Sequence, residues 1–291
     1  MSKLGRILRE YRVCLGSMRR HKPHELAVLA IFKNEAHVLR EWVNHYAAEG
    51  ATTIHLVNNN STDDYQSALQ PHTSNNLVVV HQDSRLHSQK LIYNEQLQRL
   101  RSQCNWLLVC DLDEFIYARC AHQRIIDYLR TLAPWVSSVQ IPWKMFGSSG
   151  HLLQPAAGVR AGFTKRADAD QPHPCMPEAG LIQAKIVARC SRIRSLDVHR
   201  CNLLWGLRIL PNGKPARRGD FQPIGESQLN KSTLHLNHYA IQSESLFRSV
   251  KMLRGDVNSP GYTRARDMSY FQRYDTNERT DRELALKSSQ P

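Results

Sequence analysis

Three carboxylates fall within four consecutive positions of the sequence, at Asp111, Asp113 and Glu114. They follow directly on an apolar run at 107–110, so we expect a buried strand to carry them at its end. Carboxylates this close repel one another when ionised, so either some of their pKa values rise or a cation lies among them. Oxygen-only ligands suit hard divalent ions such as Mg²⁺ or Mn²⁺.

If this segment is a strand, the directions of its acidic side chains follow from the strand geometry. If 106–113 is one strand, Asp111 and Asp113 point to the same face while Leu112 points away. Both carboxylates could then approach one ion or the phosphates bound to it. The alternative is a strand end whose acids cap a following helix or pair with nearby arginines. A bare Asp-x-Asp does not separate the two.

Further residue types suited to metal or phosphate lie late in the sequence, in HLNHY at 235–239. We expect a strand there that presents His235 and His238 on one face. Imidazole is a common metal ligand, but a histidine inside a fold also often has a purely structural role. His199, within a basic stretch, is a candidate phosphate contact or an ordinary surface residue.

Short apolar runs that alternate with amphipathic segments position these residues. Such alternation predicts strand-helix units and a largely parallel sheet, whose ligands bind outside the carboxyl ends of the strands. The first helix should stop at Gly50, because glycine commonly ends helices. In the second half of the chain the alternation of strands and helices is less regular, and we expect residues 154–180 to be loop-like. The expected strands are 26–32, 52–58, 76–82, 106–113, 137–147 and 181–189, and the expected helices are 36–49, 88–102 and 243–255.

The composition of the 291-residue chain, 41% hydrophobic and 22% charged, is typical of a soluble globular protein. There is neither a long apolar run nor a secretory signal pattern, so we expect a cytoplasmic protein whose seven scattered cysteines are reduced. The formal charge of +13 is concentrated in two stretches, +6 in residues 1–22 and +7 in residues 185–220. An acidic partner is expected at both.

The N-terminal segment 1–24 has the pattern of a basic amphipathic helix, with apolar residues on one face and arginines elsewhere. Such a helix can lie on an anionic membrane, here at its inner face, or pack on its own domain. Both alternatives remain open. The apolar positions are Leu4, Ile7, Leu8, Tyr11, Leu15 and Met18.

Five segments, in this order and spacing, resemble the GT-A type of glycosyltransferase, in particular family 92 and related family 2-like enzymes. Together they cover roughly residues 26–255. They are FKNEAHVLREWVNHYAAEG (32–50), VNNNSTDD (57–64), CDLDEF (110–115), WKMFGSSG (143–150) and HLNHYAIQSESLFRSVKMLRG (235–255).

The resemblance implies a GT-A-like α/β fold with a mostly parallel sheet flanked by helices. It also implies transfer of a sugar from a nucleotide-sugar donor to a glycan or glycolipid acceptor, as in the synthesis of a surface polysaccharide. A divalent ion, Mn²⁺ or Mg²⁺, would stabilise the charge that develops on the departing diphosphate. By the same resemblance Asp113 ligates the metal, Asp111 reaches the ribose or a metal-bound water, and His238 completes the metal shell. Glu114 would support them from behind.

The resemblance also places the nucleoside beside the ends of the first two strands. The sequence departs from the family pattern at one point: many family 2 enzymes carry an acidic pair where this chain has Asn58 and Asn59. Either the side-chain amides contact the base or ribose here, or the donor nucleotide differs from that of those enzymes. The alternative for this Asn-rich segment is a turn with helix N-caps. The candidate nucleoside-binding residues are Lys33, Asn34, Glu35, Asn58, Asn60 and Asp63.

Inversion at the anomeric carbon, the expected outcome, requires a carboxylate that accepts a proton from the acceptor. Glu226 is the candidate base, with Glu178 and Asp220 as alternatives in the same half of the chain. The Gly-Ser-Ser-Gly segment at 147–150 is either a flexible acceptor loop or a plain turn.

Two other classes of protein share some of these sequence features. A haloacid dehalogenase-like phosphohydrolase usually has Thr or Val where Phe115 stands. A non-enzymatic nucleic-acid- or membrane-binding module would explain the basic charge but not the acidic residues. No nucleic-acid-binding signature is present, so no specific nucleic-acid partner is expected. The expected organisation is an N-terminal helix (1–24), a nucleotide-sugar-binding half (25–135) and an acceptor-side half (136–275) of one domain (25–275), and a polar, frayed tail (276–291).

Overall fold

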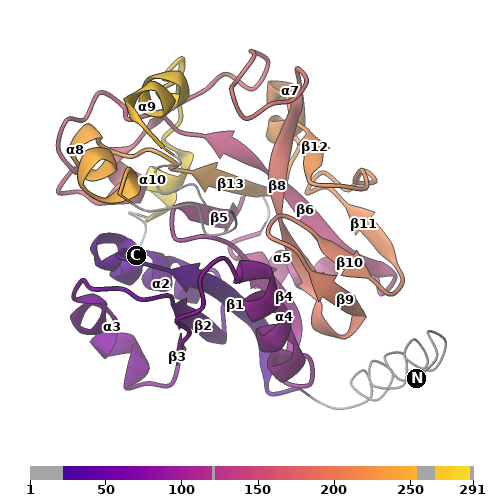
Figure 1. Cartoon of the computed structure of the whole chain (residues 1–291). Coiled ribbons are helices and arrows are strands. Elements are labelled where there is room, and N and C mark those ends of the chain that lie inside the picture. The colour runs from indigo at the N-terminus through magenta and orange to yellow at the C-terminus, as the bar shows by residue number, and fades with distance from the viewer. Residues whose placement is uncertain (1–21, 120–121, 254–265, 289–291) are drawn as a thin grey trace.

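The computed structural model describes residues 22–119, 122–253 and 266–288 (Figure 1). The helix expected over 1–24 therefore lies almost wholly outside the described residues. The following segments alternate strands with helices as the sequence predicts, because apolar runs form buried strands and the segments between them have one apolar face. They are β1 (His24–Phe32), α2 (Ala36–Ala48), β2 (Thr53–Asn58), α3 (Tyr65–Thr73), β3 (Val78–Gln82), α4 (Gln89–Leu100) and β4 (Cys104–Val109).

The strands β3, β2, β1 and β4 lie side by side in that order, and each neighbouring pair is parallel. All four strands therefore end at the same edge of the sheet, where the loops that follow them meet. Asp63, which follows β2, and Asp111, which follows β4, therefore lie in loops at one edge, but the loop after β1 lies between them, so the two loops are not adjacent.

The second half of the chain adds antiparallel pairs to the sheet. Its main elements are β5 (Glu114–Ala118), α5 (Ile125–Thr131), β6 (Val136–Met145), β8 (Leu181–Arg189) and β13 (Leu234–His238). β8 is antiparallel to β4 and β6, whereas β13 is parallel to β6 and antiparallel to β5. The α/β class is confirmed, and the sheet as a whole is mixed, because the second half has few of the helical crossovers that parallel neighbours require.

Smaller elements complete the chain: β11 and β12 extend this sheet beside β6 and β8, the others lie around it, and the segment 154–180, expected to be loop-like, contains two of them. No helix within the described ranges is long and apolar enough to cross a membrane. The smaller elements are α6 (Val159–Gly162), β7 (Lys165–Arg166), β9 (Ile193–Leu196), β10 (Cys201–Leu203), β11 (Leu207–Ile209), β12 (Phe221–Pro223), α7 (Glu226–Asn230), α8 (Glu244–Leu246), the π-helical η2 (Phe247–Lys251), α9 (Met268–Tyr274), β14 (Arg279–Thr280) and α10 (Glu283–Ser288).

The link between β4 and β5 bends the sheet. Three strands, β8, β6 and β13, lie between them in the sheet order, so in a flat sheet β4 and β5 would be about 19 Å apart. The five residue steps from Val109 to Glu114 reach at most about 18 Å when fully extended. A hydrogen bond from the Glu114 amide to the Asp111 carbonyl (3.1 Å) shortens the link further. The sheet therefore curls, and residues 110–114, which we call the acidic turn, close across the curl.

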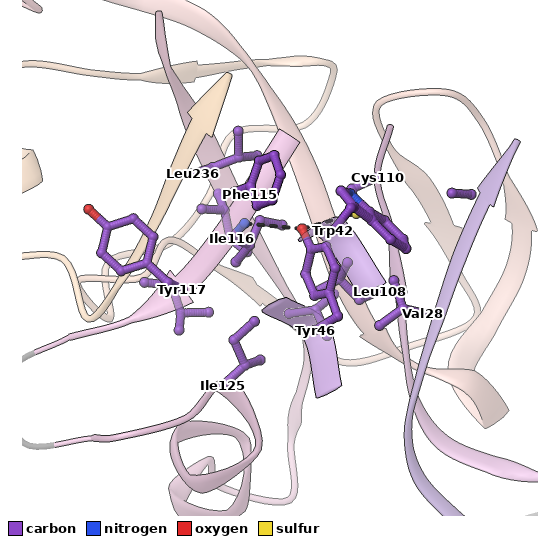
Figure 2. Close-up of a cluster of buried hydrophobic side chains, with 14 of the residues drawn as sticks. Val28, Trp42, Tyr46, Leu108, Cys110, Phe115, Ile116, Tyr117, Ile125 and Leu236 are labelled. Atoms are coloured by element: carbon purple, nitrogen blue, oxygen red, sulfur yellow. Dashed lines mark hydrogen bonds between the residues drawn. The ribbon is translucent and has the colours of Figure 1, made fainter. Parts of the chain in front are cut away.

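A large hydrophobic core holds this turn in place (Figure 2). Trp42 and Tyr46 of α2 are fully buried in it. The Trp42 indole donates hydrogen bonds to the carbonyl oxygens of Asp111 and Glu114, each 3.1 Å away. The Tyr46 hydroxyl donates to the Glu114 carbonyl and accepts from the Ile116 amide, both at 3.1 Å. Helix α2 thus fills the core and fixes the backbone of the acidic turn.

The C-terminal segment packs against the domain instead of fraying. β14 pairs with β7, and Asp281 lies 2.9 Å from both Lys144 and Arg166. Glu283 of α10 lies 2.7 Å from Arg119. The expectation of a frayed tail after about residue 275 is wrong for the described residues up to 288, because these polar side chains neutralise charges inside the domain.

The helix expected from residue 243 is only partly regular. Ser243 caps it by accepting a hydrogen bond from the Leu246 amide, and Phe247 is fully buried. The helix continues as the π-helical η2, and Leu253 near its end is 70% exposed. The expected end at Gly255 lies outside the described residues.

Candidate active site

The Asp-x-Asp sits in a turn and not in a strand. β4 ends at Val109, so Asp111 and Asp113 follow it in the acidic turn, and the argument from alternating strand faces is wrong. The prediction that they lie at the carboxyl end of a buried strand is confirmed. A turn leads directly into β5, because the Trp42 and Tyr46 hydrogen bonds draw the Glu114 carbonyl back toward α2.

Two buried lysines reach the aspartates of this turn. Lys185 of β8 lies 2.8 Å from Asp111 Oδ2, and Lys251 of η2 lies 2.8 Å from Asp113 Oδ2. Both lysine side chains are fully buried, and a buried ammonium group is stable only with such partners. Lys251 Nζ also donates to two backbone carbonyl oxygens, those of Tyr239 at 3.1 Å and Ala240 at 2.6 Å.

The neighbouring charges divide the carboxylates into two kinds. Burial raises the pKa of Glu114 well above its usual range; Lys185, 3.5 Å away, opposes this, and the two aspartates add to it. Burial also favours a raised pKa for Asp113, but Lys251 and His238 outweigh it and hold that pKa well below its usual range. Glu114 accepts a hydrogen bond from the Asp111 amide at 2.8 Å. We interpret Glu114 as a protonated support under the turn and Asp113, whose side chain is only 13% exposed, as its negative charge.

His238 lies beside Asp113. Its Nε2 is 3.6 Å from Asp113 Oδ1, and its ring packs against Trp143 with the ring centroids 4.3 Å apart. Its Nδ1 is buried without a hydrogen-bond partner among the described residues. Two ligands of one ion lie within about 5 Å of each other, and this pair satisfies that condition.

His235 lies on the other face of β13, so the expectation that the two histidines share a face is wrong. Residues three apart in a strand point to opposite faces. His235 Nδ1 is 3.0 Å from both Lys144 Nζ and Glu283 Oε2, and its Nε2 is 2.9 Å from the Leu229 carbonyl. Burial, followed by Lys144, lowers its pKa to about 4. His235 is a structural residue that joins β13 to the C-terminal segment.

The side chains at the acidic turn suit a metal ion that is shared with a substrate. Among the residues that the structure describes, no three His, Cys, Asp or Glu side chains form a group that could hold an ion alone. Asp113 and His238 could supply two ligands. Mg²⁺ is commonly held by one or two protein groups together with substrate phosphates. The donor set therefore fits an ion bound jointly with a diphosphate.

The loops proposed to bind the nucleoside lie at the expected edge, but their described hydrogen bonds largely join the loops to one another. This supports the alternative interpretation of the Asn-rich segment as a turn, and Asp64 indeed caps α3 by accepting from the Ser67 amide. The contacts are Asn34 Oδ1 to the Thr62 amide (2.7 Å), Asp63 Oδ2 to the Ala36 amide (2.7 Å), Asn58 Nδ2 to Gln82 Oε1 (2.8 Å) and Asn60 Nδ2 to the Ser84 carbonyl (3.1 Å).

Part of this edge retains polar groups with which a ligand could interact. Asp63 Oδ1 is buried without a hydrogen-bond partner among the described residues. Lys33 is half-buried, and Glu35 is buried at the start of α2. Asn34 and Asn60 have φ values of 54° and 60°, a left-handed conformation that asparagine tolerates better than most residues.

Glu226 takes part in an ion-pair cluster instead of pointing at the acidic turn. Arg166 donates to its two carboxylate oxygens at 2.7 and 2.9 Å, and the Ala169 amide donates at 2.9 Å. Burial alone would raise the pKa of Glu226, but Arg166 outweighs it and lowers that pKa. A carboxylate held in this way is a weak proton acceptor, which argues against Glu226 as the catalytic base.

The segment 147–150 is a docked turn. The amides of Ser148 and Ser149 donate to the side chains of Asp275 (2.7 Å) and Asn277 (3.0 Å). A Cβ on Gly147 would lie 2.4 Å from the Thr276 carbonyl oxygen, so only glycine fits there. These contacts favour the interpretation as a plain turn over a flexible acceptor loop.

A cleft of about 820 Å³ lies near the acidic turn, although none of residues 110–114 lines it. Its walls are the start of α4, within residues 87–94, and residues 197–199. The Val198 carbonyl accepts a hydrogen bond from Lys185 at 3.4 Å, which connects this wall to Asp111. His199 lines the cleft, and burial, followed by Lys185, lowers its pKa to about 3. The cleft therefore has a neutral imidazole in its lining and one buried cation, Lys185, behind its wall.

Sequence reasoning missed the two lysines and Trp143 as parts of the site. Signals for the lysines were present: Lys185 is the only charged residue inside the apolar core of LIQAKIVAR, and Lys251 falls four residues after the buried Phe247. Residues four apart share one helical face, so a lysine there predicts a buried ion pair. Its partner could not be read from the sequence.

The fold and the acidic turn at the carboxyl edge of its parallel strands together define a domain of the GT-A type. Residues 24–284 match the family model for Glycosyltransferase family 92, and the chain belongs to this family. The resemblance inferred from the five sequence segments is thereby confirmed.

The chain is similar to plant members of the family. It is 29% identical over 232 residues to the family 92 protein Os08g0121900 of Oryza sativa subsp. japonica, covering 79% of this chain and 35% of that protein. It is 24% identical over 236 residues to the family 92 protein At1g27200 of Arabidopsis thaliana, covering 78% and 37%. The chain thus spans little more than a third of the length of these relatives.

Two solved structures of bacterial proteins are also similar. One is S. aureus TarS 1–349 in complex with UDP, with 15% identity, a TM-score of 0.37, and coverage of 57% of this chain and 47% of that chain. The other is glucosyl-3-phosphoglycerate synthase from Mycobacterium tuberculosis in complex with Mn²⁺, UDP and glucosyl-3-phosphoglycerate, with 14% identity, a TM-score of 0.32, and coverage of 64% and 62%.

Proposed function

We propose that this chain is a metal-dependent glycosyltransferase that moves a sugar from a nucleotide-sugar donor to a glycan or glycolipid acceptor, in the synthesis of a surface polysaccharide. The observation that carries the proposal is the pair of Asp113 and His238, 3.6 Å apart, where the acidic turn follows β4 at the carboxyl edge of the parallel strands. Membership of family 92 favours this reaction over ester hydrolysis by a phosphohydrolase and over nucleic-acid binding.

Residues in and around the acidic turn would each contribute to binding a diphosphate in a different way. Asp113 and His238 would hold a divalent ion, which supplies Lewis-acid stabilisation for the charge on the departing diphosphate. Lys251 fixes one oxygen of Asp113 and leaves the other facing His238. Lys185 neutralises Asp111, so that a negatively charged donor can approach without repulsion from a second free carboxylate.

The donor would enter the cleft between α4 and residues 197–199. The nucleoside of the donor would contact the residues at the ends of β1 and β2. They are Lys33, Asn34, Glu35, Asn58, Asn60 and Asp63, and Oδ1 of Asp63 is buried without a hydrogen-bond partner among the described residues. We retain inversion as the stereochemical outcome, and because Glu226 is held by Arg166, a different group would accept the proton of the acceptor.

The test is equilibrium binding of UDP, GDP and CDP to the full chain with and without Mn²⁺, measured by isothermal titration calorimetry. We expect one nucleotide to bind with Mn²⁺ and to lose at least about tenfold in affinity in Asp113→Asn and in His238→Ala, since each removes a ligand. Glu278→Gln, an exposed carboxylate with no described side-chain contact, is the matched control and should bind like the wild type. Equal nucleotide affinity in Asp113→Asn and wild type would refute the metal site.

A further inference from the structure

The basic stretch 185–220 divides its positive charges between the interior and a second cleft. Lys185 pairs with the acidic turn, while Arg189 and Arg192 donate to the Val136 carbonyl at 2.9 and 3.2 Å. Three arginines instead line a cleft of about 380 Å³. They are Arg200, Arg208 and Arg218.

The sheet itself forms the floor of this cleft. Gln140 of β6 lines it and is only 2% exposed. Arg208 of β11 pairs in register with Ser138, and alternate residues of a strand share a face, so Arg208 and Gln140 project on the same side of the sheet. Residues of β10 and Gly219 complete the rim. The arginines are therefore held on strands and short turns.

Acidic residues of the domain only partly neutralise these arginines. Arg200 lies 3.3 Å from Asp220 and 3.8 Å from Asp197. No ion pair within ranges 22–119, 122–253 and 266–288 involves Arg208 or Arg218, and the side chain of Arg208 donates to the Cys201 carbonyl at 3.4 Å. The cleft therefore keeps an excess of positive charge, with guanidinium groups on more than one side.

The same short loop separates this cleft from the one beside the acidic turn. Asp197, Val198 and His199 line the first cleft, and Arg200 lines the second. Adjacent Cα atoms are about 3.8 Å apart, so the walls of the two clefts adjoin at residues 199 and 200. A chain molecule whose end reaches the acidic turn could therefore place a neighbouring unit among the arginines.

We propose that the cleft of Arg200, Arg208 and Arg218 binds an anionic group of the acceptor, a phosphate or carboxylate carried by a sugar one or two units from the reacting hydroxyl. Guanidinium groups match both anions through paired hydrogen bonds, and charge-assisted bonds of this kind are the strong ones. The role as an acceptor site rests on the proposed glycosyl transfer, whereas anion binding does not.

The test compares binding of four probes to the full chain by isothermal titration calorimetry: inorganic phosphate, glucose 6-phosphate, tri-galacturonic acid and the neutral maltotriose. The phosphate and carboxylate probes distinguish the two sources of the anion. Each is repeated with the double variant Arg208→Gln/Arg218→Gln and with a control of equal charge loss, Lys214→Gln/Arg217→Gln, whose side chains are exposed nearby but do not line the cleft. Circular dichroism checks that both variants are folded.

We expect an anionic sugar to bind the wild type, to bind at least about tenfold more weakly to the cleft variant, and to bind unchanged to the control. The proposal is overturned if no anionic probe binds at a concentration of about 10 mM. It is also overturned if both variants lose affinity equally, or if maltotriose binds with the same affinity as the anionic sugars. Nucleotide binding with Mn²⁺ is measured in the same samples. If it is absent while the arginine-dependent anion binding persists, glycosyl transfer fails and the anion site stands.

Discussion

Lys251 Nζ lies 2.8 Å from Asp113 Oδ2, although the two residues are 138 positions apart in the chain. The contact joins the π-helical η2 to the acidic turn and is closed off from solvent on the lysine side. It also orients the carboxylate, because the other oxygen of Asp113 is left facing His238. One ion pair thus connects the packing of the last third of the chain to the candidate metal site.

Replacing Lys251 by Met should destabilise the fold by about 3–5 kcal/mol, because it leaves the Asp113 carboxylate buried without its cation. Methionine keeps the approximate length and apolar stem of lysine, so the loss reports the charge. Urea denaturation at pH 7 measures it.

The double variant Lys251→Met/Asp113→Asn provides the control for this ion pair. Removing the unpaired charge of Asp113 should recover part of the lost stability. If the double variant instead loses as much free energy of unfolding as the two single variants added together, the two groups do not interact.

Mn²⁺ should bind weakly to the protein alone and at least about tenfold more tightly when a nucleotide diphosphate is present, because the proposed site has two protein ligands, Asp113 and His238, and no group of three His, Cys, Asp or Glu side chains among the described residues could hold an ion. Electron paramagnetic resonance of free Mn²⁺ measures both affinities. Tight binding of Mn²⁺ without nucleotide, unchanged in His238→Ala, would contradict the shared-ion arrangement.

Asp281→Asn should cost about 2 kcal/mol at pH 7 and much less near pH 2. Burial favours a raised pKa for Asp281, but Lys144 and Arg166 outweigh it and set that pKa to about 2, below the roughly 3.9 of an unfolded chain. The stabilisation is therefore fully present above about pH 4 and is lost as the pH falls through about 2.

Urea denaturation at pH 7 and at about pH 2.5 tests this dependence, with Glu278→Gln as the exposed control. A difference between wild type and Asp281→Asn that stays the same at both pH values would mean that the carboxylate charge is not the source of the stability.

Gly50→Ala should destabilise the protein by about 2–4 kcal/mol. Gly50 ends α2 with φ +93°, and a Cβ there would lie 2.3 Å from Ile126 Cγ2, so strain and overpacking add. Gly213→Ala is the matched control: its φ is +81° but no atom lies within 4 Å of the added Cβ, so only the backbone strain, about 1–2 kcal/mol, should appear. Equal losses in thermal denaturation would argue against the contact with Ile126.

Membrane binding by the N-terminal segment remains a prediction. Deleting residues 1–21 should remove binding to phosphatidylglycerol vesicles in a sedimentation assay, and in the full chain this binding should weaken with salt, since exposed charges are screened over about 8 Å at physiological ionic strength. Unchanged vesicle binding together with loss of folding would instead favour packing of this segment on its own domain.

The sequence by itself determined the regular elements near the site. Apolar runs and helical spacing predicted β1, α2, β2 and β8 to within one or two residues, because burial of one face imposes a local period that the residues themselves display. The Asp-x-Asp at the end of a buried strand and its place at the carboxyl edge also followed, since neighbouring parallel strands end together.

Only the tertiary structure decided which charges meet at that edge. The end of β4 at Val109, the turn that follows it, and the lysines that pair with Asp111 and Asp113 all depend on how the sheet curls between β4 and β5. The docking of Asp281 onto Lys144 depends on the same packing. These contacts join residues far apart in the chain, and no local period encodes them, so the sequence showed the charged groups but not their partners.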